Sequence, residues 1–272
     1  ISVLCMLLVE DKLYVSDERN IITVYDTSMM DVVRTIRCTH QAAIMVHNNN
    51  RLYTTNTVDK IITVTDTVSY AEITSFVCST RLLHGICVSS DRLFVAGGSR
   101  QGVIYVWDQA THAPLPSLEG GVDFVYALHV SGDMLYSGWE GKVLAHDISS
   151  TTNTSTGTGS GSGGTSGGTS GTVIGQMVCS PQGLVHNVTN IVKCDNILCA
   201  SRGMYIDLFD VSSLSTITTT TSTSTGTNTS TTTITCPLLH TLTGHATIIT
   251  SLHVQNYSLY SSSLDSTVKV WD

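Results

Sequence analysis

The sequence contains few charged residues and no cluster of basic ones. Asp, Glu, Lys and Arg together make up 12% of the 272 residues, and the 13 basic residues are scattered singly. Proteins that bind nucleic acids gather Lys and Arg to neutralise phosphates, so we expect no nucleic-acid partner. The formal net charge of −8 suits either a basic partner protein or simple solubility.

Motifs of catalysis and of cofactor binding are also missing. The sequence has no G-x-S-x-G, no H-E-x-x-H and no phosphate-binding loop. Two of the ten histidines, His129 and His253, occupy the same place in the similar segments ALHV and SLHV, which indicates a packing role. We therefore expect no catalytic residue, no cofactor and no bound metal.

The eight cysteines form no C-x-x-C pair, and three of them recur at one place in the similar segments RCTH, VCST and VCSP. Metal sites need clustered ligands, so we interpret the cysteines as reduced, buried side chains. Such thiols suit a reducing compartment. We expect a cytoplasmic or nuclear protein that is not secreted.

Long apolar runs are absent as well. The first residues, ISVLCMLLVEDK, are apolar over about nine positions, which is too short to span a bilayer, and they lack the basic start of a signal peptide. We interpret this segment as a core strand and expect no membrane partner. Because the sequence starts without Met and inside a repeated unit, we expect it to be part of a longer protein.

What the sequence does contain is a repeat. Six alternating apolar runs end in Asp, at positions 26, 66, 108, 147, 210 and 272, with steps of 40, 42, 39, 63 and 62 residues. A leucine marker precedes each Asp by about 13 residues. Two markers that keep step through six units, with several short β-type runs in each unit, predict a repeated β architecture. The marker leucines are Leu13, Leu52, Leu93, Leu135, Leu198 and Leu259.

Two tracts explain the longer steps. Residues 149–172 and 212–235 are dominated by Ser, Thr and Gly. Such a composition cannot bury a core, so both tracts are predicted to be disordered insertions. Both fall between the third and fourth strands of their units, and subtracting about 22 residues from each long step restores a period near 40.

The last unit identifies the family that the chain resembles. Residues 244–272 begin with Gly-His and end with Trp-Asp, and this pattern with a period near 40 resembles WD-repeat β-propellers. In that family a His, a Ser or Thr, an Asp and a Trp tie each blade together, since a buried imidazole and indole need polar partners. The resemblance assigns these roles to His245, Ser261, Asp265 and Trp271.

The other units depart from this pattern, so we expect them to be held by apolar burial more than by polar ties. The second unit keeps His40, Thr55 and Asp59 but has Thr65 at the Trp position. The third keeps Trp107 and lacks the Asp. The first, fourth and fifth units carry Tyr25, His146 and Phe209 at the Trp position.

We therefore predict an all-β fold, a β-propeller of four-stranded antiparallel blades with six recognisable WD-type repeats. Five units of four strands and a last unit of three give 23 strands. Blades stack on one another, so residues 1–272 are expected to form a single, truncated domain. Because rings of this family usually have seven blades, we expect a seven-bladed ring that is completed outside this sequence, with a six-bladed closure as the lesser option.

The resemblance also implies where a partner binds. In this family the loops between the second and third strands lie on the top face, at the mouth of the central channel. Trp139 lies there in a Gly-flanked turn, where an indole is hard to bury, and Trp and Arg are enriched in interface hot spots. The alternative is that Trp139 folds back on a neighbouring blade and the arginines are solvated. The predicted protein-binding residues are Arg19, Arg100, Trp139, Glu140 and Arg202.

The function predicted from the resemblance is a non-catalytic scaffold that binds a partner protein or peptide on the top face, within a multiprotein complex. The alternative is the targeting or substrate-recognition domain of a larger ubiquitin-ligase or kinase protein. The ligase-adaptor docking motif W-D-x-R is absent, which weighs against one class of ligase.

Overall fold

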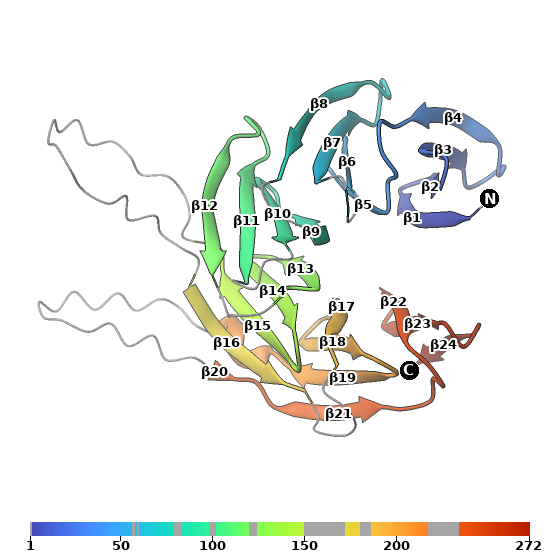
Figure 1. Cartoon of the computed structure of the whole chain (residues 1–272). Helices are drawn as coiled ribbons and strands as arrows, with labels where there is room; N and C mark the ends of the chain where they lie inside the picture. The colour runs from blue at the N-terminus through green and yellow to red at the C-terminus, as the bar shows by residue number, and fades with distance from the viewer. Residues whose placement is uncertain are drawn as a thin grey trace, which may run out of the picture. The chain divides into compact units, whose positions relative to one another are not determined.

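The computed structural model describes residues 2–55, 58, 60–78, 83–97, 102–119, 124–149, 172–179, 186–216 and 234–272. Over these ranges the regular structure is almost entirely β, with 24 strands in six sheets and one short 3-10 helix (Figure 1). This confirms the predicted all-β fold of propeller blades, and we number the sheets as blades 1 to 6. The one strand beyond the predicted 23 is β20 (Ile234–Thr235). No helix in the described ranges is long and apolar enough to cross a bilayer.

The chain divides into two compact units, Ile1–Leu115 and Pro116–Asp272. The first unit holds three antiparallel sheets in which each strand pairs with its neighbours in sequence. Blade 1 comprises β1 (Val3–Val9), β2 (Lys12–Asp17), β3 (Ile21–Asp26) and β4 (Val32–Arg37). Blade 2 comprises β5 (Ile44–Asn48), β6 (Arg51–Thr55), β7 (Ile61–Asp66) and β8 (Glu72–Val77). Blade 3 comprises β9 (Leu83–Val88), β10 (Arg92–Gly97), β11 (Val103–Asp108) and β12 (Pro114–Glu119), and β12 ends in the second unit.

The second unit holds the other three blades and the 3-10 helix η1 (Ser212–Thr216). Blade 4 comprises β13 (Ala127–Ser131), β14 (Met134–Trp139), β15 (Lys142–Asp147) and β16 (Thr172–Val178), with β20 added in parallel to β16. Blade 5 comprises β17 (Val188–Cys194), β18 (Ile197–Arg202), β19 (Tyr205–Asp210) and β21 (Leu238–Leu242). Blade 6 has the three predicted strands, β22 (Ile249–Gln255), β23 (Ser258–Ser263) and β24 (Val268–Trp271).

In every blade the marker leucine, on the second strand, lies across from the residue at the Trp position of the third strand, which just precedes the marker Asp. Because side chains alternate along a strand, a slip of one residue would turn the core side chains to the wrong face. The regular spacing in the sequence therefore reflects one constant register. The six pairs are Leu13–Tyr25, Leu52–Thr65, Leu93–Trp107, Leu135–His146, Leu198–Phe209 and Leu259–Trp271.

The turn between the second and third strands has one backbone feature in all six blades. Each such turn contains a residue with positive φ, a conformation typical of tight hairpins. We call the end of a blade that carries this turn its upper end, and the opposite end its lower end. The positive-φ residues are Asn20, Lys60, Gly102, Gly141, Gly203 and Ser266.

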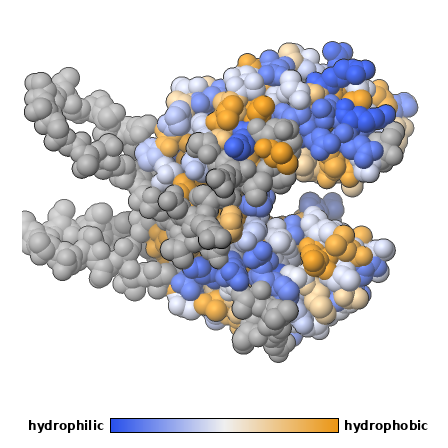
Figure 2. Space-filling view, in the orientation of Figure 1, coloured by the Kyte–Doolittle hydropathy of each residue, from blue (hydrophilic) through white to orange (hydrophobic). Residues whose placement is uncertain are grey.

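Apolar side chains of consecutive blades meet to form the core. In the first unit, for example, Tyr14 and Val24 of blade 1 pack with Met45 and Leu52 of blade 2. The second strand of a blade is the most deeply buried, and every residue of β10 is buried, whereas β4 is mostly exposed. Exposed apolar side chains form separate groups among hydrophilic ones on the face in view (Figure 2).

The predicted insertions lie mostly outside the described residues, at 150–171 and 217–233. At the described ends of the predicted ranges 149–172 and 212–235, Thr172 begins β16, residues 212–216 form η1 and residues 234–235 form β20. Leu214 of η1 is buried, and its Cδ2 lies 2.6 Å from where a Cβ on Gly175 of β16 would stand. Ile234 of β20 packs against the same apolar cluster. These apolar side chains anchor the tract ends to the sheet.

The Asp that ends a third strand holds the turn that follows it. Oδ1 of Asp108 accepts hydrogen bonds from the backbone N–H groups of Ala110 (3.0 Å) and Thr111 (2.7 Å), and from the Thr111 hydroxyl (2.7 Å). The hydroxyl and then the N–H of Thr111 hold the pKa of Asp108 below its usual range. Hydrogen bonds of the same kind lower the pKa of Asp26, Asp66 and Asp210.

We expect the substitution Asp108→Ala to lower the free energy of unfolding by about 1 kcal/mol, because two backbone N–H groups lose their acceptor. Urea denaturation followed by circular dichroism measures this loss. Asp31→Ala is the control, since the exposed Asp31 follows the corresponding turn of blade 1 and its described contact is made by its backbone carbonyl. Equal losses in the two variants would contradict a capping role.

Candidate functional site

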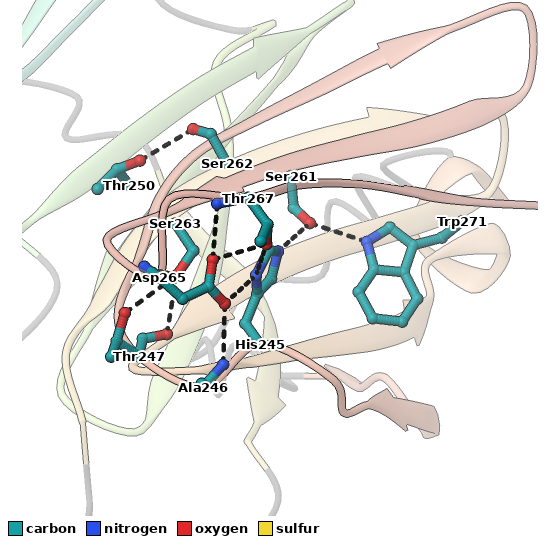
Figure 3. A network of polar contacts seen from close by, with 10 residues as sticks. All are labelled: His245, Ala246, Thr247, Thr250, Ser261, Ser262, Ser263, Asp265, Thr267 and Trp271. Carbon is teal, nitrogen blue, oxygen red and sulfur yellow. Dashed lines mark hydrogen bonds and ion pairs between the residues drawn. The ribbon is translucent and has the colours of Figure 1, made fainter.

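The four residues that the family resemblance assigns to the polar tie meet in blade 6 (Figure 3). Nδ1 of His245 lies 2.8 Å from Oδ2 of Asp265, and Nε2 of His245 lies 2.7 Å from Oγ of Ser261. The indole N–H of Trp271 donates to the same Ser261 oxygen at 2.9 Å. The four side chains thus form one continuous chain of hydrogen bonds from strand β24 back to the loop before β22.

The carboxylate at the end of this chain is held by several donors. The Thr267 hydroxyl donates to Oδ1 of Asp265 at 2.6 Å, and the backbone N–H of Ala246 donates to Oδ2 at 2.9 Å. These bonds, with that of His245, hold the pKa of Asp265 well below its usual range. An ionised Asp265 can only accept, so Nδ1–H of His245 donates a hydrogen bond to it, and Nε2 of His245 accepts a hydrogen bond from the Ser261 hydroxyl.

The order Ser261, His245, Asp265 is that of a Ser–His–Asp catalytic triad, but its surroundings differ. Ser261 is 1% exposed, and its oxygen already accepts the indole hydrogen bond of Trp271. A nucleophilic serine must reach its substrate, and here the hydroxyl is closed off by the blade. The arrangement therefore serves to tie strands β23 and β24 to the preceding loop.

Blade 4 makes a similar tie from different residues. The indole N–H of Trp139 donates to Oγ of Ser137 at 2.8 Å, and Nε2 of His146 lies 2.8 Å from the same oxygen. As in blade 6, one serine on the second strand joins an indole to an imidazole. The rings come from different segments in the two blades. In blade 4 the imidazole comes from the third strand and the indole from the second, whereas in blade 6 the indole comes from the third strand and the imidazole from the loop before the first. The signal in the sequence is a serine two residues after the marker leucine.

Of the two expectations for Trp139, the structure agrees with the alternative, in which the side chain folds back and is buried at the end of β14. Its side chain is 0% exposed. The reason lies in Gly138: a Cβ at this position would stand 2.7 Å from the carbonyl oxygen of Val188, so the glycine lets β17 of blade 5 approach β14 closely. The strand from the neighbouring blade covers the indole, which leaves Trp139 with a role in packing.

Arg202 is likewise buried rather than offered to a partner. Its Nε donates to Oδ2 of Asp207 at 2.6 Å, and both side chains are almost completely buried. The Thr241 hydroxyl donates to the other carboxylate oxygen at 2.6 Å, and the guanidinium lies 5.0 Å from the ring centroid of Tyr205. Blade 5 thus replaces the His–Ser–Trp tie with a buried ion pair between β18 and β19.

The remaining predicted binding residues have separate positions. Arg19 is exposed and paired with Asp17, Nε to Oδ2, at 3.0 Å. Glu140 is exposed at the end of β14, beside Asn187. Arg100 lies outside the described residues. Arg19 belongs to the first unit and Glu140 to the second.

Blade 2 does not join His40 and Thr55 in the tie that the sequence predicted. The register places Thr54, not Thr55, at the position of Ser261, and the Thr55 hydroxyl donates to the carbonyl oxygen of Ile61 at 2.8 Å. Within the described residues, Nε2 of His40 and Oγ1 of Thr54 have no hydrogen-bond partner. Asp59 lies outside the described residues. Over the described ranges, no three His, Cys, Asp or Glu side chains gather as a metal site requires.

Comparisons with known proteins agree with this architecture. Residues 236–272 match the family model described as WD domain, G-beta repeat. A computationally designed protein, Ika8, is similar over 99% of this chain and 70% of its own, with 17% identity and a TM-score of 0.68. A chain in the crystal structure of a mitotic checkpoint complex is similar over 99% of this chain and 74% of its own, with 13% identity and a TM-score of 0.74. A comparison with curated proteins finds no match.

At these identities the structural likeness shows the fold, and the family match lies in the blade that carries the complete tie. Together they confirm the resemblance to WD-repeat β-propellers. Such propellers are generally non-catalytic scaffolds for protein interactions.

We expect Ser261→Ala to lower the free energy of unfolding by about 2 kcal/mol, because it leaves a buried indole N–H and a buried imidazole nitrogen without a partner. Ser262→Ala, whose hydroxyl meets Thr250 on the exposed side of the same strand, should change it by less than about 0.5 kcal/mol. Urea denaturation of the two variants compares these values, and a similar small change in both would refute the tie.

The second tie predicts a dependence on pH. Burial lowers the pKa of His146 to about 4, whereas an unfolded chain has a histidine pKa of about 6.5. The unfolded state thus binds the proton more readily, so stability is complete above pH 6.5 and falls as the pH drops towards 4. We expect His146 to account for a loss of about 2 kcal/mol between pH 8 and pH 5. Urea unfolding at both pH values should show this loss reduced in His146→Phe, and unchanged in His253→Phe, which alters an exposed histidine.

Proposed function

We propose that this WD-repeat β-propeller chain is a non-catalytic scaffold that binds a partner protein or peptide at the upper ends of blades 5 and 6. One observation carries the proposal: three exposed apolar side chains gather there. Met204 is 36% exposed in the turn after β18, Ile248 is 53% exposed just before β22, and Leu264 is 67% exposed in the turn after β23. We call these three residues the turn patch.

Backbone hydrogen bonds connect the three segments that carry the turn patch. The N–H of Ile249 donates to the carbonyl oxygen of Gly203 at 2.8 Å, and the N–H of Leu264 donates to that of Ile248 at 3.0 Å. The loop before β22 is thereby joined to the turn of blade 5 on one side and to the turn of blade 6 on the other. A preformed apolar surface of this kind loses little conformational entropy when it binds, and exposed apolar groups with polar surroundings are typical of interaction sites.

The turn patch replaces the residues that the sequence led us to expect. Trp139 and Arg202 are buried and paired, so they support the blades beneath this surface rather than touching a partner. Glu140 is exposed at the upper end of blade 4 and stays in the proposal as a polar neighbour. Arg19 and Arg100 stay as predictions for the first unit.

The chemistry of the surface suggests the partner. Three aliphatic side chains without a charged group among them suit a peptide or loop that presents apolar side chains. We propose that this partner belongs to a multiprotein complex in the cytoplasm or nucleus. All eight cysteines have free thiols in the structure, which supports a reducing compartment.

We expect Ile248→Asp and Leu264→Asp to lower the recovery of bound partners at least about tenfold, because each places a charge in the apolar surface. Affinity capture with the full chain, followed by quantitative mass spectrometry, measures the recovery. Tyr257→Asp is the matched control: Tyr257 is 78% exposed but lies in the turn after β22, at the lower end of blade 6. If the two variants recover the same partners as the unchanged chain while remaining folded, the turn patch is not the binding surface.

A further inference from the structure

The lower ends of blades 4 and 5 enclose a cavity of about 320 Å³. It is lined by the turn after β13, by the ends of β15 and β17, and by η1. Its lining carries charged side chains of both signs, which are the acidic Asp133 and Asp147 and the basic Lys193. Such a volume is at the small end of the range for sites that hold small molecules.

Lys193 occupies a position that is not charged in any other blade. It lies on β17 directly opposite the marker leucine Leu198. The other blades carry four apolar residues and one histidine at this position, so the lysine departs from the pattern of the repeat. The residues opposite the marker leucine in the other blades are Leu8, His47, Val88, Val130 and Val254.

No carboxylate within the described ranges forms an ion pair with Lys193. Its side chain is half-buried. Burial first, and then the charge of Lys193, lowers the pKa of His129 to about 4. The centroid of the His129 ring lies 6.5 Å from that of Tyr136, which lines the cavity together with Lys193.

We propose that this cavity binds a free α-amino acid with an apolar side chain. Lys193 and the Asn196 amide would hold the carboxylate, and Asp133 and Asp147 would hold the ammonium group. A ligand with only negative charge would meet two carboxylates, and a ligand with only positive charge would meet Lys193, so the charges select a zwitterion. The apolar side chain has a matching wall, which includes Leu214.

This proposal concerns the end of the blades opposite to the turn patch. The turns that line the cavity join first to second strands, whereas the turn patch lies at turns that join second to third strands. Antiparallel neighbours turn at alternating ends, so a ligand in the cavity leaves the turn patch free. The two proposals can therefore fail separately.

Isothermal titration of the full chain with L-leucine and L-methionine tests the site. We expect saturable binding of one molecule per chain, and binding at least about tenfold weaker for N-acetyl-leucine, which lacks the ammonium, and for leucinamide, which lacks the carboxylate. Absence of saturable binding at millimolar concentrations would overturn the proposal. Equal affinity for leucine and N-acetyl-leucine would overturn it too, because a simple anion site would bind both.

Two substitutions assign the charges to residues. Lys193→Met should weaken leucine binding at least about tenfold while the chain stays folded, since four of the other five blades carry an apolar residue at this position. Lys269→Met removes the same charge from β24, outside the cavity, and should leave leucine binding unchanged. Asp133→Asn should reduce the difference in affinity between leucine and N-acetyl-leucine, because it removes a negative charge that would hold the ammonium group. Unchanged leucine affinity in Lys193→Met would refute the site. Recovery of partner proteins by the same variant tests only the proposed function of the turn patch.

Discussion

The structure depends on one cross-strand pairing that is repeated in six hairpins. In each blade the marker leucine of the second strand lies opposite the Trp-position residue of the third, as Leu135 does with His146 and Leu259 with Trp271. This register decides which side chains face the neighbouring blade and which turn lies at the upper end. A shift of one residue would reverse every side chain, so the blades keep this register although the residue at the Trp position and the length of the turn between the two strands vary.

Blades 4, 5 and 6 share this strand pairing but contain different buried polar contacts. Blade 6 joins His245 to Trp271 through a serine, and blade 4 joins the same two ring types, carried by different segments, through another serine. Blade 5 uses the ion pair of Arg202 and Asp207. In each of these blades a polar side chain of the second strand, Ser261, Ser137 or Arg202, joins groups within the blade. The groups that are joined differ from blade to blade, so the common strand pairing does not require one particular set of residues.

The two ends of the blades in the second unit have different proposed roles, which are partner binding at the upper end and ligand binding at the lower end. At the upper end three exposed apolar side chains form the turn patch, with polar residues such as Glu140 and Thr247 exposed near them. At the lower end the repeat pattern is broken by Lys193, beside a cavity whose lining carries both charges. Trp139 and Arg202, which the sequence predicted to bind a partner, are thus buried parts of the blades. The proposed binding residues are the exposed ones of the turn patch.

The sequence by itself determined the class of fold, the six units, the three strands of the last unit and the residues of its tie. It could do so because strand alternation and repeat spacing are local properties of the chain. Only the tertiary structure decided that Trp139 is covered, because that depends on the approach of β17 over Gly138, and that Arg202 has a buried partner on the next strand. It also decided that the insertion ends carrying Leu214 and Ile234 are ordered, since their burial requires the outer strand of another blade. Side chains are buried between blades by segments that are distant in sequence, so a local sequence pattern cannot predict which of them are covered.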